Sequence, residues 1–128
     1  MNSKSILTGL LISIFLFGFA LADGDFRGTV YYNGCSWTSG DEVEVYNVMT
    51  PGDKDRYTIY CCDSNYNGHY YTDDYPPGTY VLKVVLAEGS DCIAPALGVQ
   101  VVHGTQDQFV HLSVRGKKQE QPDGGGDE

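Results

Sequence analysis

The sequence predicts an all-β domain, a seven-stranded β-sandwich. Short alternating or apolar segments recur along the chain, separated by clusters of Gly, Pro, Asn and Asp. Such spacing is typical of sandwiches, and no stretch shows the period of an amphipathic helix. The predicted strands cover residues 26–33, 42–48, 56–62, 69–75, 79–87, 97–102 and 108–114.

The alternation of side chains along each strand predicts which residues share a face. Val43 and Val45 share one face of the second strand. In the fifth strand Tyr80 begins a core-facing set, while Val81 and Val85 make the opposite face apolar as well. A strand that is apolar on both faces is predicted to lie in the centre of its sheet.

The N-terminus resembles a secretory leader. Lys4 precedes an apolar run over residues 6–19, and Ala20-Leu21-Ala22 fits the small-x-small rule for cleavage before Asp23. The run is shorter than the roughly 20 residues that span a bilayer. We therefore predict a signal peptide over residues 1–22, a secreted or periplasmic location, and no membrane insertion after cleavage.

The remaining chain suits one domain over residues 23–116. Residues 117–128 contain only Lys, Gln, Glu, Pro, Asp and Gly, so we predict a disordered tail. Without the leader, seven basic residues face seventeen acidic ones, a formal charge of −10. Such a charge repels phosphates, which argues against nucleic acid and anionic membranes as partners.

Four cysteines lie in the exported part, where oxidising conditions favour disulfides over metal thiolates. They are Cys35, Cys61, Cys62 and Cys92. A bond between neighbours is incompatible with a regular strand over residues 56–62, so we predict that one of the adjacent pair reaches Cys35 and the other Cys92. The spacing leaves open which goes where.

Several motifs resemble the carboxypeptidase regulatory-like family. They are Phe26-Arg27-Gly28-Thr29-Val30 in the first strand, Val43-x-Val45 in the second, and the Pro77-Gly78-x-Tyr80 turn. The resemblance implies a Greek-key, transthyretin-like sandwich that serves as a non-catalytic module. It also places the loops bearing the four cysteines at one end of the sandwich.

We predict a binding surface at that cysteine-rich end, because loops on a rigid sandwich commonly carry recognition. The predicted residues are Trp37, Tyr66, Asp63, Asp73 and Asp91. The chain also has ten tyrosines. Because successive side chains of a strand point to opposite faces, some of these rings must point partly outward. They are Tyr60, one of the pair Tyr31 and Tyr32, and one of the pair Tyr70 and Tyr71.

A second pattern suggests calcium. Asp63, Asn65 and Asn67 match the first half of a calcium-binding loop, with Asp74 at its twelfth position. The same residues are ordinary hairpin formers, and the flanks read as strands rather than helices. The turn interpretation is favoured, and no other cofactor is expected.

No local signature of an activated nucleophile or acid-base pair is present, so we expect no enzyme activity. The predicted function is a module for protein interaction or assembly with a surface or extracellular protein. The alternative is a carbohydrate-binding module, with or without calcium, because exposed aromatic rings stack on glycans.

Overall fold

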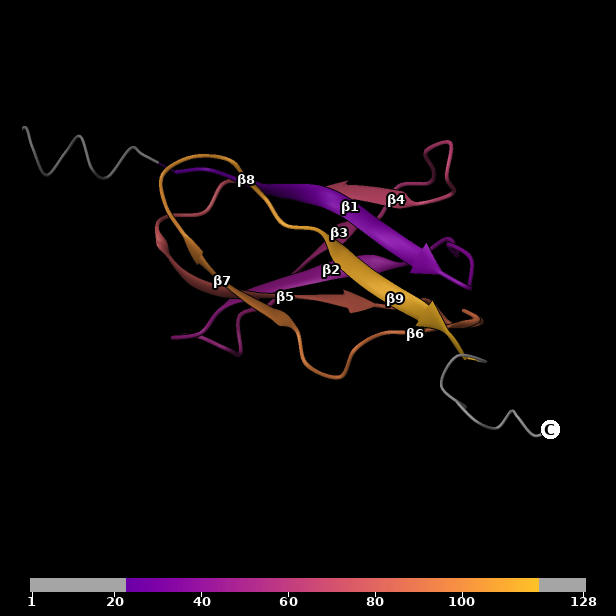
Figure 1. Ribbon diagram of the computed structural model, residues 1–128. Helices are drawn as coiled ribbons and strands as arrows, with labels where there is room; N and C mark the ends of the chain where they lie inside the picture. Colours follow the sequence, from indigo (N-terminus) through magenta and orange to yellow (C-terminus); the bar gives the residue numbers. More distant parts are fainter. Residues whose placement is uncertain (1–22, 118–128) are drawn as a thin grey trace, which may run out of the picture.

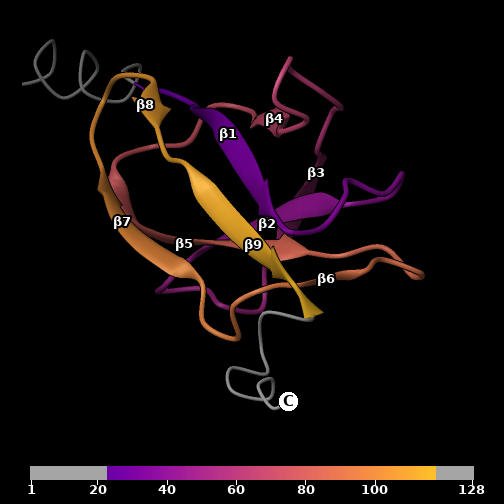
Figure 2. The same ribbon diagram turned by 45° about the vertical axis from the view of Figure 1, so that its right-hand side comes forward.

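The computed structural model describes residues 23–117, and all the elements in that range are strands. The predicted signal peptide and residues 118–128 of the predicted tail lie outside it. A mixed sheet and an antiparallel sheet share one core (Figures 1 and 2). Within the described range, no helix is long and apolar enough to cross a membrane.

The first sheet has the order β4-β1-β9-β6, with β8 also paired to β1. Its strands are β1 (Phe26–Asn33), β4 (Gly68–Tyr71), β6 (Cys92–Ile93), β8 (Gln108–Phe109) and β9 (Leu112–Gly116). Both β8 and β9 run parallel to β1, and β4 runs antiparallel to it on the other side. Figure 1 shows β1 and β9 side by side in this layer.

The second sheet has the order β3-β2-β5-β7 and is wholly antiparallel. Its strands are β2 (Glu42–Asn47), β3 (Asp55–Thr58), β5 (Gly78–Val85) and β7 (Val99–His103). The central position predicted for residues 79–87 is confirmed, because β5 pairs with β2 on one side and β7 on the other.

Alternation selects the core from both sheets. Phe26 and Val30 of β1 are fully buried, as are Val43 and Val45 of β2 and Leu82 of β5. Neighbours one position along each strand face away from this core, which is the period of two that β-strands impose. The predicted shared face of Val43 and Val45 is confirmed.

The strand count is nine rather than the predicted seven. The predicted strand 108–114 is interrupted at Val110, whose carbonyl accepts a 2.6 Å hydrogen bond from the Tyr70 hydroxyl. A Cβ at Gly28 would overlap this carbonyl, so only glycine permits the close approach. The extra strand β6 lies in a predicted loop and pairs with β9.

The structure has two disulfides, but the predicted pairing is wrong. Cys35 bonds Cys92, and Cys61 bonds its neighbour Cys62. Because β3 ends at Thr58, the adjacent cysteines lie in an exposed loop and escape the geometry of a regular strand. Cys35 follows β1, and Cys92 lies in β6. Because β1 and β6 both pair with β9, the Cα atoms of the two cysteines are only 5.3 Å apart.

Asp41 is a fully buried carboxylate that joins three segments. Its Oδ2 accepts hydrogen bonds from the Tyr32 hydroxyl and the Thr38 amide, both at 2.9 Å. Its Oδ1 accepts from the Ala87 amide at 2.8 Å. Three donors therefore compensate the loss of water around the charge, as a buried carboxylate requires.

Substituting Asp41→Asn replaces one acceptor oxygen with an NH2 group, which leaves at least one buried donor without a partner. We expect the free energy of unfolding to fall by about 2 kcal/mol. Urea denaturation of the oxidised protein measures this loss. Asp73→Asn, at an exposed position, is the control and should change stability by less than about 0.5 kcal/mol. Equal effects at both positions would contradict the central role of Asp41.

Buried tyrosines make the fold sensitive to alkali. Burial and the hydrogen bond to Asp41 raise the pKa of Tyr32, and burial raises the pKa of Tyr70. The folded state therefore holds these protons more tightly than the unfolded chain. Their stabilising effect is complete below the unfolded pKa of about 10 and is lost as the pH rises above it.

We expect the free energy of unfolding to decline above about pH 10, by about 1.4 kcal/mol per pH unit for each such tyrosine. Denaturation curves between about pH 8 and pH 11 measure the slope. Tyr32→Phe removes one of the titrating groups and should flatten the decline. A slope that this substitution leaves unchanged would show that other groups govern alkaline stability.

The disulfide pairing is open to direct measurement. Proteolysis of the oxidised protein is expected to release a Cys35 peptide joined to a Cys92 peptide. The peptide that contains Cys61 and Cys62 should run alone, lighter by two hydrogen atoms than after reduction. Mass spectrometry distinguishes this pattern from any cross-link between the adjacent pair and the other two cysteines.

Candidate functional site

A recess on the described surface lies over β1, on the outer face of the first sheet. It is a groove of about 480 Å³ whose floor is formed by Arg27, Gly28 and Thr29. We call it the aromatic groove, because ring-bearing side chains form both of its walls. These are His69 and Tyr71 on one side, and Phe109 and His111 on the other.

Strand register explains why the rings gather there. Arg27 lies opposite Tyr71 of β4 and Phe109 of β8, and Thr29 lies opposite His69. Residues two apart in a strand share a face, so each wall carries two successive rings. The two walls stand on the segments that flank β1 on either side, and the backbones of these two segments are roughly 10 Å apart. This width suits a single ligand chain laid along β1.

The β4 wall is extended by Tyr60. Its ring stacks on His69 at 5.6 Å and on Tyr71 at 5.8 Å between centroids, with interplanar angles of 28° and 15°. A hydrogen bond with Tyr60 raises the pKa of Tyr71, so the phenol stays protonated at neutral pH. Tyr71 is nevertheless 57% exposed, and its ring is open to a ligand.

The opposite wall depends on the interruption between β8 and β9. His111 accepts a 3.0 Å hydrogen bond from the Thr29 amide through Nδ1, so its ring takes the place of a backbone carbonyl in the ladder. The ring also contacts Phe109 in a stacked arrangement at 6.3 Å and Tyr31 edge-on at 6.0 Å. Phe109 is 69% exposed, which is unusual for so large an apolar side chain.

Arg27 is held in place at one end of the floor. Its guanidinium donates to Asp25 at 2.9 and 2.5 Å and to Asp107 at 3.2 Å. The hydrogen bond with Asp25 and the charge of that carboxylate raise the pKa of Arg27. The amide of Asp25 donates to Asp107 and, with the charge of Arg27, lowers the pKa of that carboxyl. The charge of Arg27 is therefore matched locally.

Carboxylate oxygens of Asp25, Asp74 and Asp107 lie within 4.8 Å of one another beside this arginine. Asp74 is the predicted twelfth position of the calcium loop. Asp63, Asn65 and Asn67 lie toward the other end of β1, because Asn67 accepts from the Tyr32 amide whereas Tyr71 pairs with Arg27. The structure therefore separates Asp74 from the other three residues.

Asp63 uses a side-chain oxygen within the loop, whereas the side-chain oxygen of Asn67 accepts from the Tyr32 amide of β1. Asp63 Oδ1 accepts hydrogen bonds from the amides of Asn65 and Asn67, both at 2.9 Å. This is the turn chemistry that such residues provide. Calcium binding at Asp63, Asn65, Asn67 and Asp74 stays a prediction.

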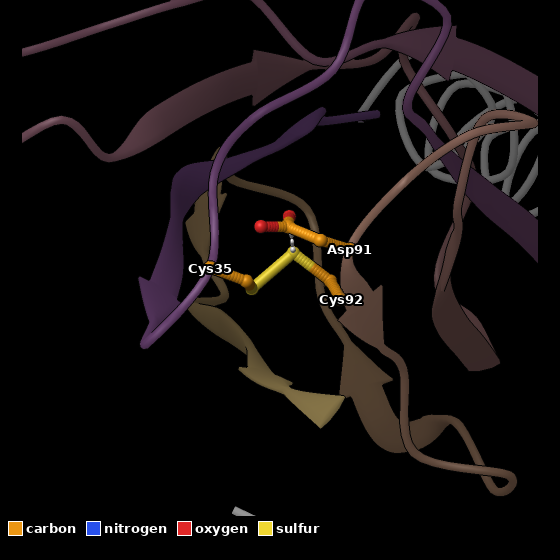
Figure 3. A group of neighbouring side chains, drawn as sticks. All are labelled: Cys35, Asp91 and Cys92. Atoms are coloured by element: carbon orange, nitrogen blue, oxygen red, sulfur yellow. Dashed lines mark hydrogen bonds between the residues drawn. A yellow bond between two sulfur atoms is a disulfide. The ribbon is translucent and has the colours of Figure 1, made fainter. Parts of the chain in front are cut away.

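Part of the predicted cysteine-rich surface is brought together. Trp37 is half-buried, packs on the core and donates from Nε1 to the Ile59 carbonyl at 2.8 Å. Asp91 accepts from the Ser36 amide at 3.1 Å and lies beside the Cys35–Cys92 disulfide (Figure 3). Because the two sulfur atoms are bonded to each other, they are not free thiolate ligands for a metal.

Two other predicted binding residues, Tyr66 and Asp73, lie on opposite sides of β4 in the chain. Tyr66 is 79% exposed in the loop before β4. Asp73 follows β4 at the opposite end, where the Thr72 amide donates to the Phe26 carbonyl. The predicted convergence therefore includes Trp37 and Asp91 but not Asp73.

The groove residues could be read only in part from the sequence. Alternation predicts that one of Tyr70 and Tyr71 points outward, and the structure shows that it is Tyr71. Phe109 and His111 were missed, because their positions beside Arg27 and Thr29 depend on parallel pairing between the two ends of the domain. No local signal in the sequence reveals that pairing.

No family model matches this chain, and no curated protein matches it either. Among solved structures, the chain is similar to the Bacillus anthracis TIE protein, with 17% sequence identity and a TM-score of 0.53. The match covers 74% of this chain and 17% of that one. At this identity the likeness concerns the fold alone.

Proposed function

We propose that this chain is an exported recognition module that binds a neutral carbohydrate in the aromatic groove. The observation that supports this function is a pair of facing aromatic walls above a polar floor. Sugar rings combine apolar C–H faces with a rim of hydroxyl groups. The aromatic rings of Tyr71 and Phe109 suit the apolar C–H faces of a sugar, and the polar groups of Thr29 and Arg27 suit its hydroxyl groups.

Charge favours a neutral glycan over an acidic one. The cationic group at the groove, Arg27, is already paired with Asp25 and Asp107. The exported chain carries a formal charge of −10. An acidic polysaccharide would meet repulsion from the whole molecule without gaining an unpaired cation in the groove.

The proposal is for binding without turnover. None of the residues that line the groove in the described chain is Asp, Glu or Cys. Glycoside hydrolysis ordinarily needs two carboxyl groups that flank the bond to be broken. The predicted leader and the two disulfides support an extracellular or periplasmic place of action.

A protein partner is the second candidate, favoured by the edge strand β7. In the described chain β7 pairs only with β5, and its Val99 and Val102 are 43% and 77% exposed. Open strand edges add strands from other chains. Val102→Lys should abolish such pairing while leaving the aromatic groove unchanged.

We further infer a kinship with the carboxypeptidase regulatory-like family and its transthyretin-like, Greek-key topology. The support is the Pro77-Gly78-x-Tyr80 turn, which leads directly into the central strand β5. Tyr80 anchors this turn by donating from its hydroxyl to the Pro76 carbonyl at 2.7 Å.

The carbohydrate proposal predicts the effect of removing each wall. Tyr71→Ala and Phe109→Ala are each expected to weaken binding about tenfold, because each removes one stacking face. Affinity electrophoresis in gels that contain soluble neutral glucans, mannans or xylans measures the change. Tyr66→Ala is the matched control, since it removes a still more exposed ring outside the groove.

Retention of full binding by the Tyr71→Ala, Phe109→Ala double variant would contradict the proposal. So would a loss caused by Tyr66→Ala or Trp37→Ala alone, which would instead favour the loops at the cysteine-rich end. If no neutral polysaccharide slows the protein while a surface protein is captured and Val102→Lys releases it, the second candidate is supported.

A further inference from the structure

A second cavity lies at one end of the other sheet, where the β2–β3 turn meets the segment before β5. Its volume is about 460 Å³. Three tyrosine rings line it, from Tyr46, Tyr75 and Tyr80. Two carboxylates, Asp53 and Asp55, also line it. We call it the tyrosine cavity.

The inner rings are held in place by their hydroxyl groups. Tyr75 donates to Asp55 Oδ2 at 2.6 Å and lies 2.6 Å from the Tyr57 hydroxyl. Tyr75 and Tyr80 contact each other with ring centroids 5.2 Å apart. Burial and the hydrogen bond to Asp55 raise the pKa of Tyr75, so its hydroxyl remains a donor at neutral pH.

The outer ring already has a cation beside it. Lys54 Nζ lies 5.3 Å from the centroid of Tyr46. This distance is within the range of a cation–π interaction. Lys54 stands between Asp53 and Asp55 in the sequence, so the local balance is two carboxylates against one ammonium.

We propose that the tyrosine cavity binds an alkyl chain that ends in an ammonium or guanidinium group. The methylene groups pack on Tyr75, whose ring rests on the buried Tyr80, and the charge faces Asp53, Asp55 and the Tyr46 ring. Two electrostatic contributions favour a cationic ligand. One is the negative charge of the nearby carboxylates, and the other is the negative formal charge of the chain without its predicted leader. The site is separate from the aromatic groove and does not depend on a carbohydrate ligand.

The test is an NMR titration of the oxidised protein without its predicted leader, residues 23–128. It uses two matched probes that differ in the charge of one group. Nα-acetyl-lysine methyl ester has one charge, on its side chain, and its Nε-acetylated counterpart has none. We expect saturable shifts at residues of the cavity with the first probe alone. A parallel titration with putrescine distinguishes a free diamine from a side chain carried by a peptide, according to which binds more tightly.

Neighbouring variants should act in opposite directions. Asp53→Asn removes an attracting charge and is expected to weaken binding of the lysine ester about fivefold. Lys54→Gln removes the competing ammonium and should strengthen it. A general effect of misfolding cannot produce such a pair of opposite changes, and the denaturation midpoint of each variant provides a check.

Tyr71→Ala in the aromatic groove is the control and should leave cation binding unchanged, whatever its effect on glycan binding. Equal binding of the charged and acetylated probes would overturn the proposal. So would an absence of saturable shifts at millimolar cation, or weaker binding by Lys54→Gln. None of these results bears on the carbohydrate proposal, because they concern residues outside the groove.

Discussion

The structure depends most on the buried carboxylate of Asp41. Tyr32 reaches it from the first sheet, and Ala87 donates to it just after the central strand of the second sheet. Its own carbonyl accepts from the Ile59 amide, which follows β3. An unpaired charge at this depth would cost several kcal/mol, so the three segments must stay together for the fold to persist.

The aromatic groove follows from that constraint through β1. Tyr32 holds one end of β1 through its hydrogen bond to Asp41. In the other half of β1, Gly28 leaves room for the Val110 carbonyl, which accepts a hydrogen bond from the Tyr70 hydroxyl. The break at Val110 is what turns His111 toward Thr29 and leaves Phe109 on the surface. A packing requirement inside the sandwich thus determines the shape of the aromatic groove outside it.

Alternation predicted the strands and the core well, because burial on one face is a local property of the sequence. It identified β1, β2 and β5 nearly to the residue, including the central place of β5. It failed where long-range contacts decide. The adjacent pair Cys61 and Cys62 was assigned to a strand that ends at Thr58, and that error also produced the wrong disulfide pairing.

The candidate site was harder to predict for the same physical reason. Its walls come from segments about forty residues away from β1 in sequence on one side and about eighty on the other. Two loop residues that the sequence favoured, Trp37 and Asp63, turn out to use their polar atoms in hydrogen bonds within the fold. Polar and aromatic residues in a loop therefore signal a turn as readily as a binding surface.

Local charge balance, rather than net charge, separates the ligand classes that we propose for the two recesses. At the aromatic groove the guanidinium of Arg27 meets two carboxylates that bond directly to it, so the floor is polar without an open charge. At the tyrosine cavity two carboxylates face one ammonium, and that ammonium lies on the outer ring. The same acidic chain thereby presents a surface suited to hydroxyl groups over β1 and a surface suited to cations beside the β2–β3 turn.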